Sequence, residues 1–294
     1  MVNCKIKQLI QAHPLAEGAG VTVHRTIGTP QLRHLDPFLM LDHFGSDNPD
    51  EYIAGFPDHP HRGFITFTYM LDGHMLHQDS MGNRGDLKAG GAQWMKAASG
   101  VIHSEMPQQL NGLMRGFQLW INLPAAQKMS APEYQEFSAD AFPVVELPEG
   151  QIKVICGAHG EVRGPITDSN TEMFYFDLTI AAGQILNLDV PASHQCFAYC
   201  YEGEAAVSEE TDSATIPTHC LTVFSAGDSI PLRAGPDGAR LILVGGKPIK
   251  EDIVQYGPFV MNSRAEIELA IRDFQAGKLV REKAAFVSDH SPAK

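Results

Sequence analysis

The sequence lacks several features that would assign it to a membrane or nucleic-acid-binding class. It contains no run of eighteen apolar residues, which a membrane-spanning helix requires. Basic residues are scarce, with 22 Lys and Arg against 35 Asp and Glu and a formal net charge of −13. Binding to phosphate backbones needs a basic surface. We therefore predict no membrane association and no direct binding of nucleic acid.

Cysteine is also rare, and no CxxC spacing occurs. The chain has an odd number of cysteines: Cys4, Cys156, Cys196, Cys200 and Cys220. Such a pattern favours reduced, mostly buried thiols over a disulfide framework. The first seven residues show neither a long apolar core nor a cleavage site, so no signal peptide is expected. Together these absences predict a cytoplasmic protein.

Glycine and proline, by contrast, are abundant, with 27 and 19 residues in a chain of 294. Many turns between short segments of alternating polarity favour an all-β fold. One segment differs, because Ser263-Arg264-Ala265-Glu266 is a capping box followed by apolar residues at helical spacing, namely Ile267, Ala270, Ile271 and Phe274. We predict a single amphipathic helix there, about four turns long, that covers a barrel.

An internal repeat divides the chain. The segment Phe67–Gly73 (FTYMLDG) aligns with Phe197–Gly203 (FAYCYEG), and Ala89-Gly90-Gly91 aligns with Ala226-Gly227-Asp228. The repeat predicts two tandem β-barrels. We expect an N-terminal domain over residues 1–135, a C-terminal domain with the helix over residues 150–294, and a proline-rich linker over residues 136–149.

Two pairs of candidate metal ligands lie in the first repeat. His59 and His61 are two residues apart, and so are His103 and Glu105. Side chains at i and i+2 of a strand share a face, so two facing strands would bring all four ligands together. Three imidazoles and one carboxylate suit Fe, Zn, Cu, Ni or Mn rather than Ca or Mg. Two polar strand edges facing solvent are the structural alternative, which would leave the His-Pro-His geometry without a use.

The second repeat has lost these ligands. At the repeat offsets, His59 and His61 fall on Asp189 and Pro191, while His103 and Glu105 fall on Arg240 and Ile242. The C-terminal barrel is therefore predicted to be metal-free. Three other residues of the first half receive supporting roles: His77 beside the ligands, His43 in packing or capping, and Trp120 in the core.

Several motifs together resemble the pirin family of the cupin superfamily. They are Leu35–Phe38, His59–Phe64, Gln93–Met95, Gly100–Pro107 and Tyr256–Asn262. The resemblance runs from about residue 20 to residue 280. It implies a bicupin, with two jelly-roll cupin β-barrels, and one mononuclear Fe(II) at the positions matching His59, His61, His103 and Glu105. Many cupins place a glutamate four residues after the second histidine, which is Ile65 here, and the resemblance assigns that role to Glu105.

The resemblance also implies two functions of different classes. One is a quercetin 2,3-dioxygenase activity, which cleaves a flavonol ring with O₂ and in which Glu105 would accept the flavonol hydroxyl proton. The alternative is an iron-dependent, redox-sensing regulator that binds a protein partner. A closed structural Zn site with four protein ligands is a third hypothesis. We favour the oxygenase, because an open His-rich site is costly to maintain for stability alone.

Overall fold

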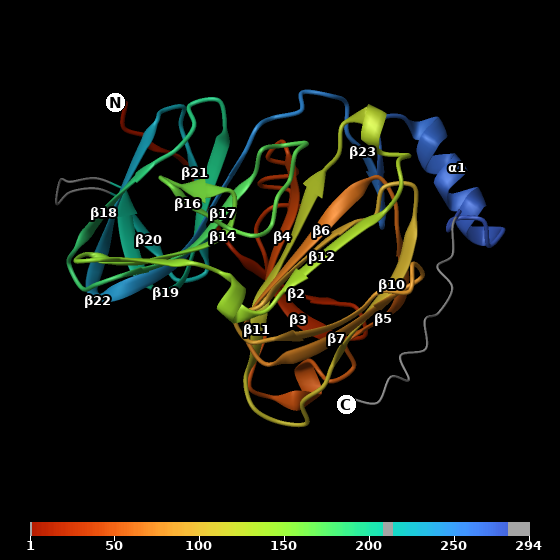
Figure 1. The fold of residues 1–294 in the computed structure, drawn as a ribbon, viewed down its shortest axis with the longest axis horizontal. Coiled ribbons are helices and arrows are strands. Elements are labelled where there is room, and N and C mark those ends of the chain that lie inside the picture. Colours follow the sequence, from red (N-terminus) through yellow and green to blue (C-terminus); the bar gives the residue numbers. More distant parts are fainter. Residues whose placement is uncertain (1, 208–213, 282–294) are drawn as a thin grey trace.

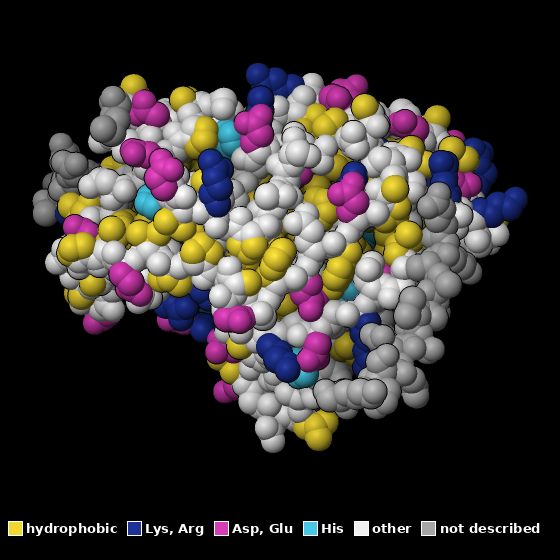
Figure 2. Space-filling view, viewed as in Figure 1, with side chains coloured by type: hydrophobic (Ala, Val, Ile, Leu, Met, Phe, Trp, Pro, Cys, Tyr) yellow, Lys and Arg dark blue, Asp and Glu magenta, His cyan; other side chains and the backbone are white. Residues whose placement is uncertain are grey.

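The computed structural model describes residues 2–207 and 214–281, and almost all of its regular structure is β-strand (Figure 1). The strands form two halves that lie side by side, and helix α1 (Arg264–Gln275) lies at the outer edge of the first half. Acidic, basic and apolar side chains are interspersed over the face shown in Figure 2, and the outline is indented where the halves meet. The all-β prediction is confirmed.

Two sheets build the first half. The seven-stranded sheet has the order β12-β9-β6-β11-β4-β3-β2. Its members are β2 (His13–Glu17), β3 (Val21–Arg25), β4 (Phe38–Ser46), β6 (Phe64–Asp72), β9 (Ala92–Lys96), β11 (Met114–Asn122) and β12 (Glu133–Phe137). The second sheet has the order β5-β10-β7-β8, with β5 (Phe56–His61), β7 (His74–Asp79), β8 (Arg84–Lys88) and β10 (Val101–Pro107). All of these pairings are antiparallel.

A single large sheet builds the second half. Its main path is β1-β21-β19-β22-β17-β14-β13, with β18 paired to β22 and β20 paired to β19. The members are β1 (Ile6–Gln11), β13 (Val144–Leu147), β14 (Gly150–Cys156), β17 (Phe174–Ile180), β18 (Ile185–Asp189), β19 (Gln195–Val207), β20 (Thr215–Pro217), β21 (Cys220–Phe224) and β22 (Ser229–Gly246). The remaining elements are β15 (Ala158–His159), β16 (Val162–Arg163), β23 (Val254–Tyr256), β24 (Phe259–Met261), and the 3-10 turns η1 (Pro49–Glu51), η2 (Ala125–Gln127) and η3 (Ala139–Ala141).

The two halves share one hydrophobic core. In β11, Phe117, Leu119 and Ile121 belong to this core, together with Phe197 and Tyr199 of β19. The alternate residues of β11 point to the other face of the sheet, as the twofold period of a strand requires. The seven-stranded sheet is therefore shared, with the second half on one side and a pocket on the other.

The N-terminal strand β1 belongs to the second half, and the C-terminal helix α1 packs against the first half. Strand β1 pairs with β21 in the second sheet, although it precedes the whole first half in sequence. Helix α1 contacts the first half, where Arg62 donates to Asp273 over 2.8 Å. Within residues 136–149, β12 ends at Phe137 in the first sheet and β13 begins at Val144 in the second. The segment is thus partly strand, and the domain division at 135 and 150 stays a prediction.

The repeat and the helix appear in the expected places. Strand β6 pairs with β9 and β11, and β19 pairs with β20, β21 and β22. The glycines that end the aligned segments, Gly73 and Gly203, have φ of +95° and +68°. The Ser263 side chain accepts from the Glu266 amide, which confirms Ser263 as the N-cap, and the Glu266 carboxylate accepts from the Asn262 amide over 3.1 Å. The helix has 12 residues, somewhat fewer than the four turns predicted, and Gly277 turns the chain after its end at φ +66°. No helix within the described ranges is long and apolar enough to cross a membrane.

Candidate metal centre

Strand pairing brings three of the four predicted ligands together. In the register of β5 with β10, His103 lies opposite His59 and Val101 lies opposite His61. An irregularity follows His103, so that Glu105 pairs with Phe56 rather than with Pro57. Such a break re-aims the side chains beyond it. The register before this irregularity places the ligand atoms of His59, His61 and His103 within 4.8 Å of one another.

The three imidazole rings have the spacing expected around one ion. Their centroids are 4.6 Å apart for His59–His61, 4.4 Å for His59–His103 and 4.9 Å for His61–His103. A metal–nitrogen bond of about 2.1 Å and bond angles of about 90–110° at the metal would place two ring centroids about 4.5–5.5 Å apart. Two of the observed separations lie at the short end of that range, and the His59–His103 separation of 4.4 Å is just below it.

Free ring nitrogens also fit a metal. His61 is 2 % and His103 1 % exposed, yet His61 Nδ1 and His103 Nε2 have no hydrogen-bond partner. His59 Nδ1 lies 2.8 Å from the Pro57 carbonyl and can donate to it, which leaves Nε2 with its lone pair. Burial, and then neighbouring imidazoles, hold the pKa of His61 and of His103 well below the usual value. Neutral imidazoles with unshared lone pairs are what a transition metal binds.

His103 is positioned from behind by a buried pair on β7. His103 Nδ1 lies 3.4 Å from His77 Nδ1, and His77 Nε2 lies 3.4 Å from Asp79 Oδ2. Both residues of that pair are buried, and Asn83 donates to Asp79 over 2.8 Å. With the proton of His77 on Nε2 toward the carboxylate, His77 Nδ1 can accept from His103 Nδ1–H. The arrangement leaves His103 Nε2 as the free donor atom.

Glu105 occupies a different position from the three histidines. Its carboxylate forms a group with His103 and His77, within 4.8 Å, and does not join the group of His59, His61 and His103 among the described residues. Gln118 donates to Glu105 Oε2 over 3.3 Å, and the Thr68 hydroxyl lies 3.1 Å from Oε1. That hydroxyl also lies 2.6 Å from the Gln118 side-chain oxygen, and its single proton serves one acceptor at a time.

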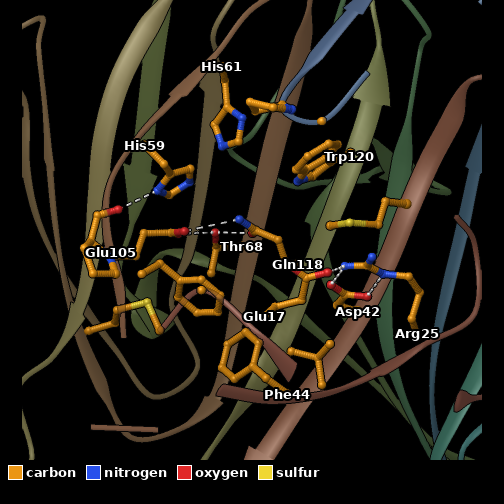
Figure 3. A pocket seen from close by; sticks show the side chains of 18 of the residues that line it. Glu17, Arg25, Asp42, Phe44, His59, His61, Thr68, Glu105, Gln118 and Trp120 are labelled. Atoms are coloured by element: carbon orange, nitrogen blue, oxygen red, sulfur yellow. Dashed lines mark hydrogen bonds and ion pairs between the residues drawn. The ribbon is translucent and has the colours of Figure 1, made fainter. Parts of the chain in front are cut away.

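A pocket of about 600 Å³ opens beside these residues. In Figure 3, His59 and His61 stand at one end, Glu105 with Thr68 and Gln118 at one side, and the Arg25–Asp42 pair across from them. The Arg25 guanidinium makes two hydrogen bonds with Asp42, of 2.7 and 2.6 Å. Apolar side chains complete the wall, including Val23, Met40, Phe44, Phe56, Met75 and Trp120.

The structure corrects one sequence expectation and adds residues that the sequence did not indicate. Trp120 was expected in the core but lines the pocket, 5.2 Å from the His61 ring, because even-numbered residues of β11 face away from the shared core. Gln118 and Thr68 point into the pocket for the same reason. The twofold alternation of β11 and β6 in the sequence indicates which residues share a face. It does not indicate which of the two faces lines the pocket, because that depends on how the strands are paired.

Comparisons with known proteins agree over almost the whole chain. Family models described as Pirin and as Pirin C-terminal cupin domain match residues 20–121 and 175–280. A protein of Pseudomonas aeruginosa, provisionally named a quercetin 2,3-dioxygenase, is 47% identical over 93% of this chain and 97% of its own length. A pirin-like protein of Caulobacter vibrioides is 44% identical, covering 93% and 98%. The crystal structure of a quercetin 2,3-dioxygenase from Acinetobacter baumannii superimposes with a TM-score of 0.87, at 32% identity over 94% and 98% of the two chains.

Proposed function

Because the chain belongs to the pirin family and consists of two cupin domains, we propose that it is a metal-dependent dioxygenase of the quercetin 2,3-dioxygenase type. The proposed substrates are a flavonol-like aromatic compound and O₂. The observation that carries the proposal is the cluster of His59, His61 and His103, with two unpartnered buried nitrogens, at the wall of an open pocket.

We assign the metal to His59, His61 and His103, with Glu105 as a fourth ligand or as a base beside the ion. Fe(II) is the proposed ion; Zn, Cu, Ni and Mn also suit these donors. Such a metal would lower the pKa of a bound hydroxyl and link the substrate to O₂ electronically. An open pocket next to three histidines argues against a closed tetrahedral Zn site, which has four protein ligands and no free position.

The polar residues around Glu105 suit a general base. Glu105 is 4 % exposed and accepts hydrogen bonds from neutral donors, so it is held in place without a neutralising cation. A flavonol hydroxyl that binds next to His59 would lie within reach of this carboxylate. When Glu105 takes up that proton, the Thr68 hydroxyl can donate to the Gln118 side-chain oxygen instead of to Glu105. The Thr68 hydroxyl then keeps a hydrogen-bond partner.

The pocket walls suit a flat, largely apolar substrate with a few polar groups. The volume of about 600 Å³ lies inside the range of about 300–1,000 Å³ for small-molecule sites. The Trp120 and Phe44 rings offer faces and edges for aromatic contact. The Arg25–Asp42 pair offers fixed donors and acceptors at the far side, where hydroxyl groups of such a substrate would hydrogen-bond.

The test is oxygen uptake by Fe(II)-reconstituted protein with quercetin, with the metal content measured on the same samples. We expect metal-dependent uptake and a ring-cleavage product, both lost in His61→Ala. The matched control is His74→Ala, which removes a partly exposed histidine that contacts Asp86 outside the pocket. Activity that survives in His61→Ala would refute the assignment.

A different outcome would favour regulation. If the protein retains iron, loses it in His61→Ala and consumes no oxygen with any flavonol tried, the oxygenase proposal fails. The same centre would then support the redox-sensing hypothesis, because a change between Fe(II) and Fe(III) alters the charge of a buried site by one unit. The next measurement would be capture of a protein partner by each oxidation state.

A further inference from the structure

A second cluster of three histidines lies on the opposite face of the seven-stranded sheet from the pocket. His24 on β3 and His43 on β4 are directly opposite each other in the strand register. Their neighbours Val23, Arg25 and Asp42 line the pocket, so the two imidazoles project toward the second half of the molecule. His219, in the turn between β20 and β21, meets them from that half.

The rings of this cluster lie about as close together as those of the first but are nearer to parallel, with interplanar angles of 29–40° against 51–86°. The ligand atoms of His24, His43 and His219 lie within 4.8 Å of one another. Ring centroids are 4.5 Å apart for His24–His219, 5.3 Å for His43–His219 and 6.2 Å for His24–His43. Two of these separations lie within the range of about 4.5–5.5 Å expected for imidazoles on one ion, and the His24–His43 separation is longer.

Two ring nitrogens in the cluster are buried without a partner. They are His24 Nδ1 and His43 Nε2, and His43 is only 3 % exposed. A buried polar atom without a hydrogen bond is costly in a core, so each such atom calls for an explanation. Burial, and then the neighbouring imidazoles, hold the pKa of His43 well below its usual value, and burial lowers the pKa of His219.

The Tyr199 hydroxyl orients two of the three rings. It lies 3.2 Å from Nδ1 of His43 and 3.2 Å from Nδ1 of His219. A phenolic oxygen has two lone pairs and can accept from both N–H groups, which would leave each Nε2 free to bind a metal. Carboxylate–histidine–metal arrangements use a hydrogen bond to the outer nitrogen in the same way.

The backbone holds His219 in a conformation that few residues adopt. His219 has φ +61°, a region that most L-residues avoid. Its amide donates to the Cys200 carbonyl, and its own carbonyl accepts from the Ala12 amide, each over 2.8 Å. This turn places the ring against the first half, and a strained residue fixed from both sides is typical of a functional position.

We propose that His24, His43 and His219 form a second metal site, which binds a Zn²⁺-class ion and joins the two halves of the molecule. Three imidazoles with a water as fourth ligand suit Zn²⁺, and the partial exposure of His24 and His219 gives the ion an entrance. This site is independent of the proposed oxygenase centre, because it shares no residue with it and lies across the sheet.

The test counts bound zinc after equilibrium dialysis of metal-free protein against ZnCl₂. We expect about two ions per chain in the unmodified protein and about one in His61→Ala. In the His61→Ala background, His219→Asn should remove the remaining ion. Asparagine tolerates the left-handed backbone at this position, so the turn is preserved. His194→Asn is the matched control, since it removes a half-buried imidazole elsewhere in the second half.

A spectrum and a melting curve complete the test. Co²⁺ added to the His61→Ala variant should give visible absorption bands, and the double variant with His61→Ala and His219→Asn should not show them. Zn²⁺ should raise the melting temperature of the His61→Ala variant but not that of the double variant. One ion in the unmodified protein and none in His61→Ala would overturn the proposal. So would a second ion that survives His219→Asn, because it would then bind elsewhere.

Discussion

The Nδ1 atoms of His103 and His77 lie 3.4 Å apart, and this contact connects a proposed ligand to a buried carboxylate. Only one of two facing nitrogens can carry the proton, so the contact fixes one tautomer in each ring. Asp79 decides which, because its carboxylate accepts only from a protonated His77 Nε2. His77 and Asp79 are therefore positioning residues for the proposed metal.

Asp79→Asn should weaken metal binding. The amide nitrogen of asparagine can donate to His77 Nε2, which favours the tautomer that no longer accepts from His103. Loss of such an outer partner typically costs about 10–100-fold in metal affinity. Competition with a chelator of known affinity measures the change. Asp86→Asn is the control, because Asp86 also forms a carboxylate–imidazole contact, with His74, but near the surface and away from the pocket.

The pH dependence of stability should report the same carboxylate. Burial raises the pKa of Asp79, but hydrogen bonds from His77 and Asn83 outweigh it, so the folded-state pKa lies below the usual value. An acid with a lowered pKa stabilises the fold above its unfolded pKa, and that contribution is lost as the pH falls through its folded pKa. Urea unfolding of metal-free protein should show Asp79→Asn to be less stable at pH 7 and closer to the unmodified protein near pH 3. If the difference in the free energy of unfolding between the two proteins grew as the pH fell, the lowered pKa of Asp79 would be contradicted.

Glu105→Gln should separate binding from turnover. The substitution keeps the size of the side chain but removes the base, so we expect kcat with quercetin to fall about 10²–10⁴-fold. If Glu105 acts as the base, metal should be retained, since His59, His61 and His103 are unchanged; if Glu105 is a fourth ligand, the metal content should fall as well. Steady-state kinetics with metal analysis of each sample measures both. If turnover stayed normal with full metal content, Glu105 would not be the base.

The shared core between the halves allows a matched pair of substitutions. The Tyr69 hydroxyl donates to buried Asp177 over 2.7 Å, whereas the Tyr175 hydroxyl, also buried, has no hydrogen-bond partner. Tyr69→Phe leaves Asp177 with one donor fewer and should cost about 1–3 kcal/mol of the free energy of unfolding. Tyr175→Phe removes an unsatisfied group and should be neutral or stabilising. Equal losses in the two variants, measured by chemical unfolding, would contradict this view of the interface.

Local patterns in the sequence determined much of this protein. The spacing of His59 and His61 placed both on one face of a strand, the alternation from Phe64 to Leu71 predicted β6, and Ser263 with Glu266 marked the start of α1. These features depend on residues within a few positions of one another. The backbone geometry of a strand or a helix therefore decides them without reference to the rest of the chain.

Only the tertiary structure decided how strands from distant segments meet. The register of β5 with β10 sets His103 opposite His59, and the irregularity after it moves Glu105 out of the histidine group. Strand pairing also determined which face of β11 lines the pocket, and Trp120 lies on that face. The packing of the two halves brought His219 next to His24 and His43, which are about two hundred residues away in the sequence. No local pattern encodes such contacts, because each depends on the packing of whole sheets against one another.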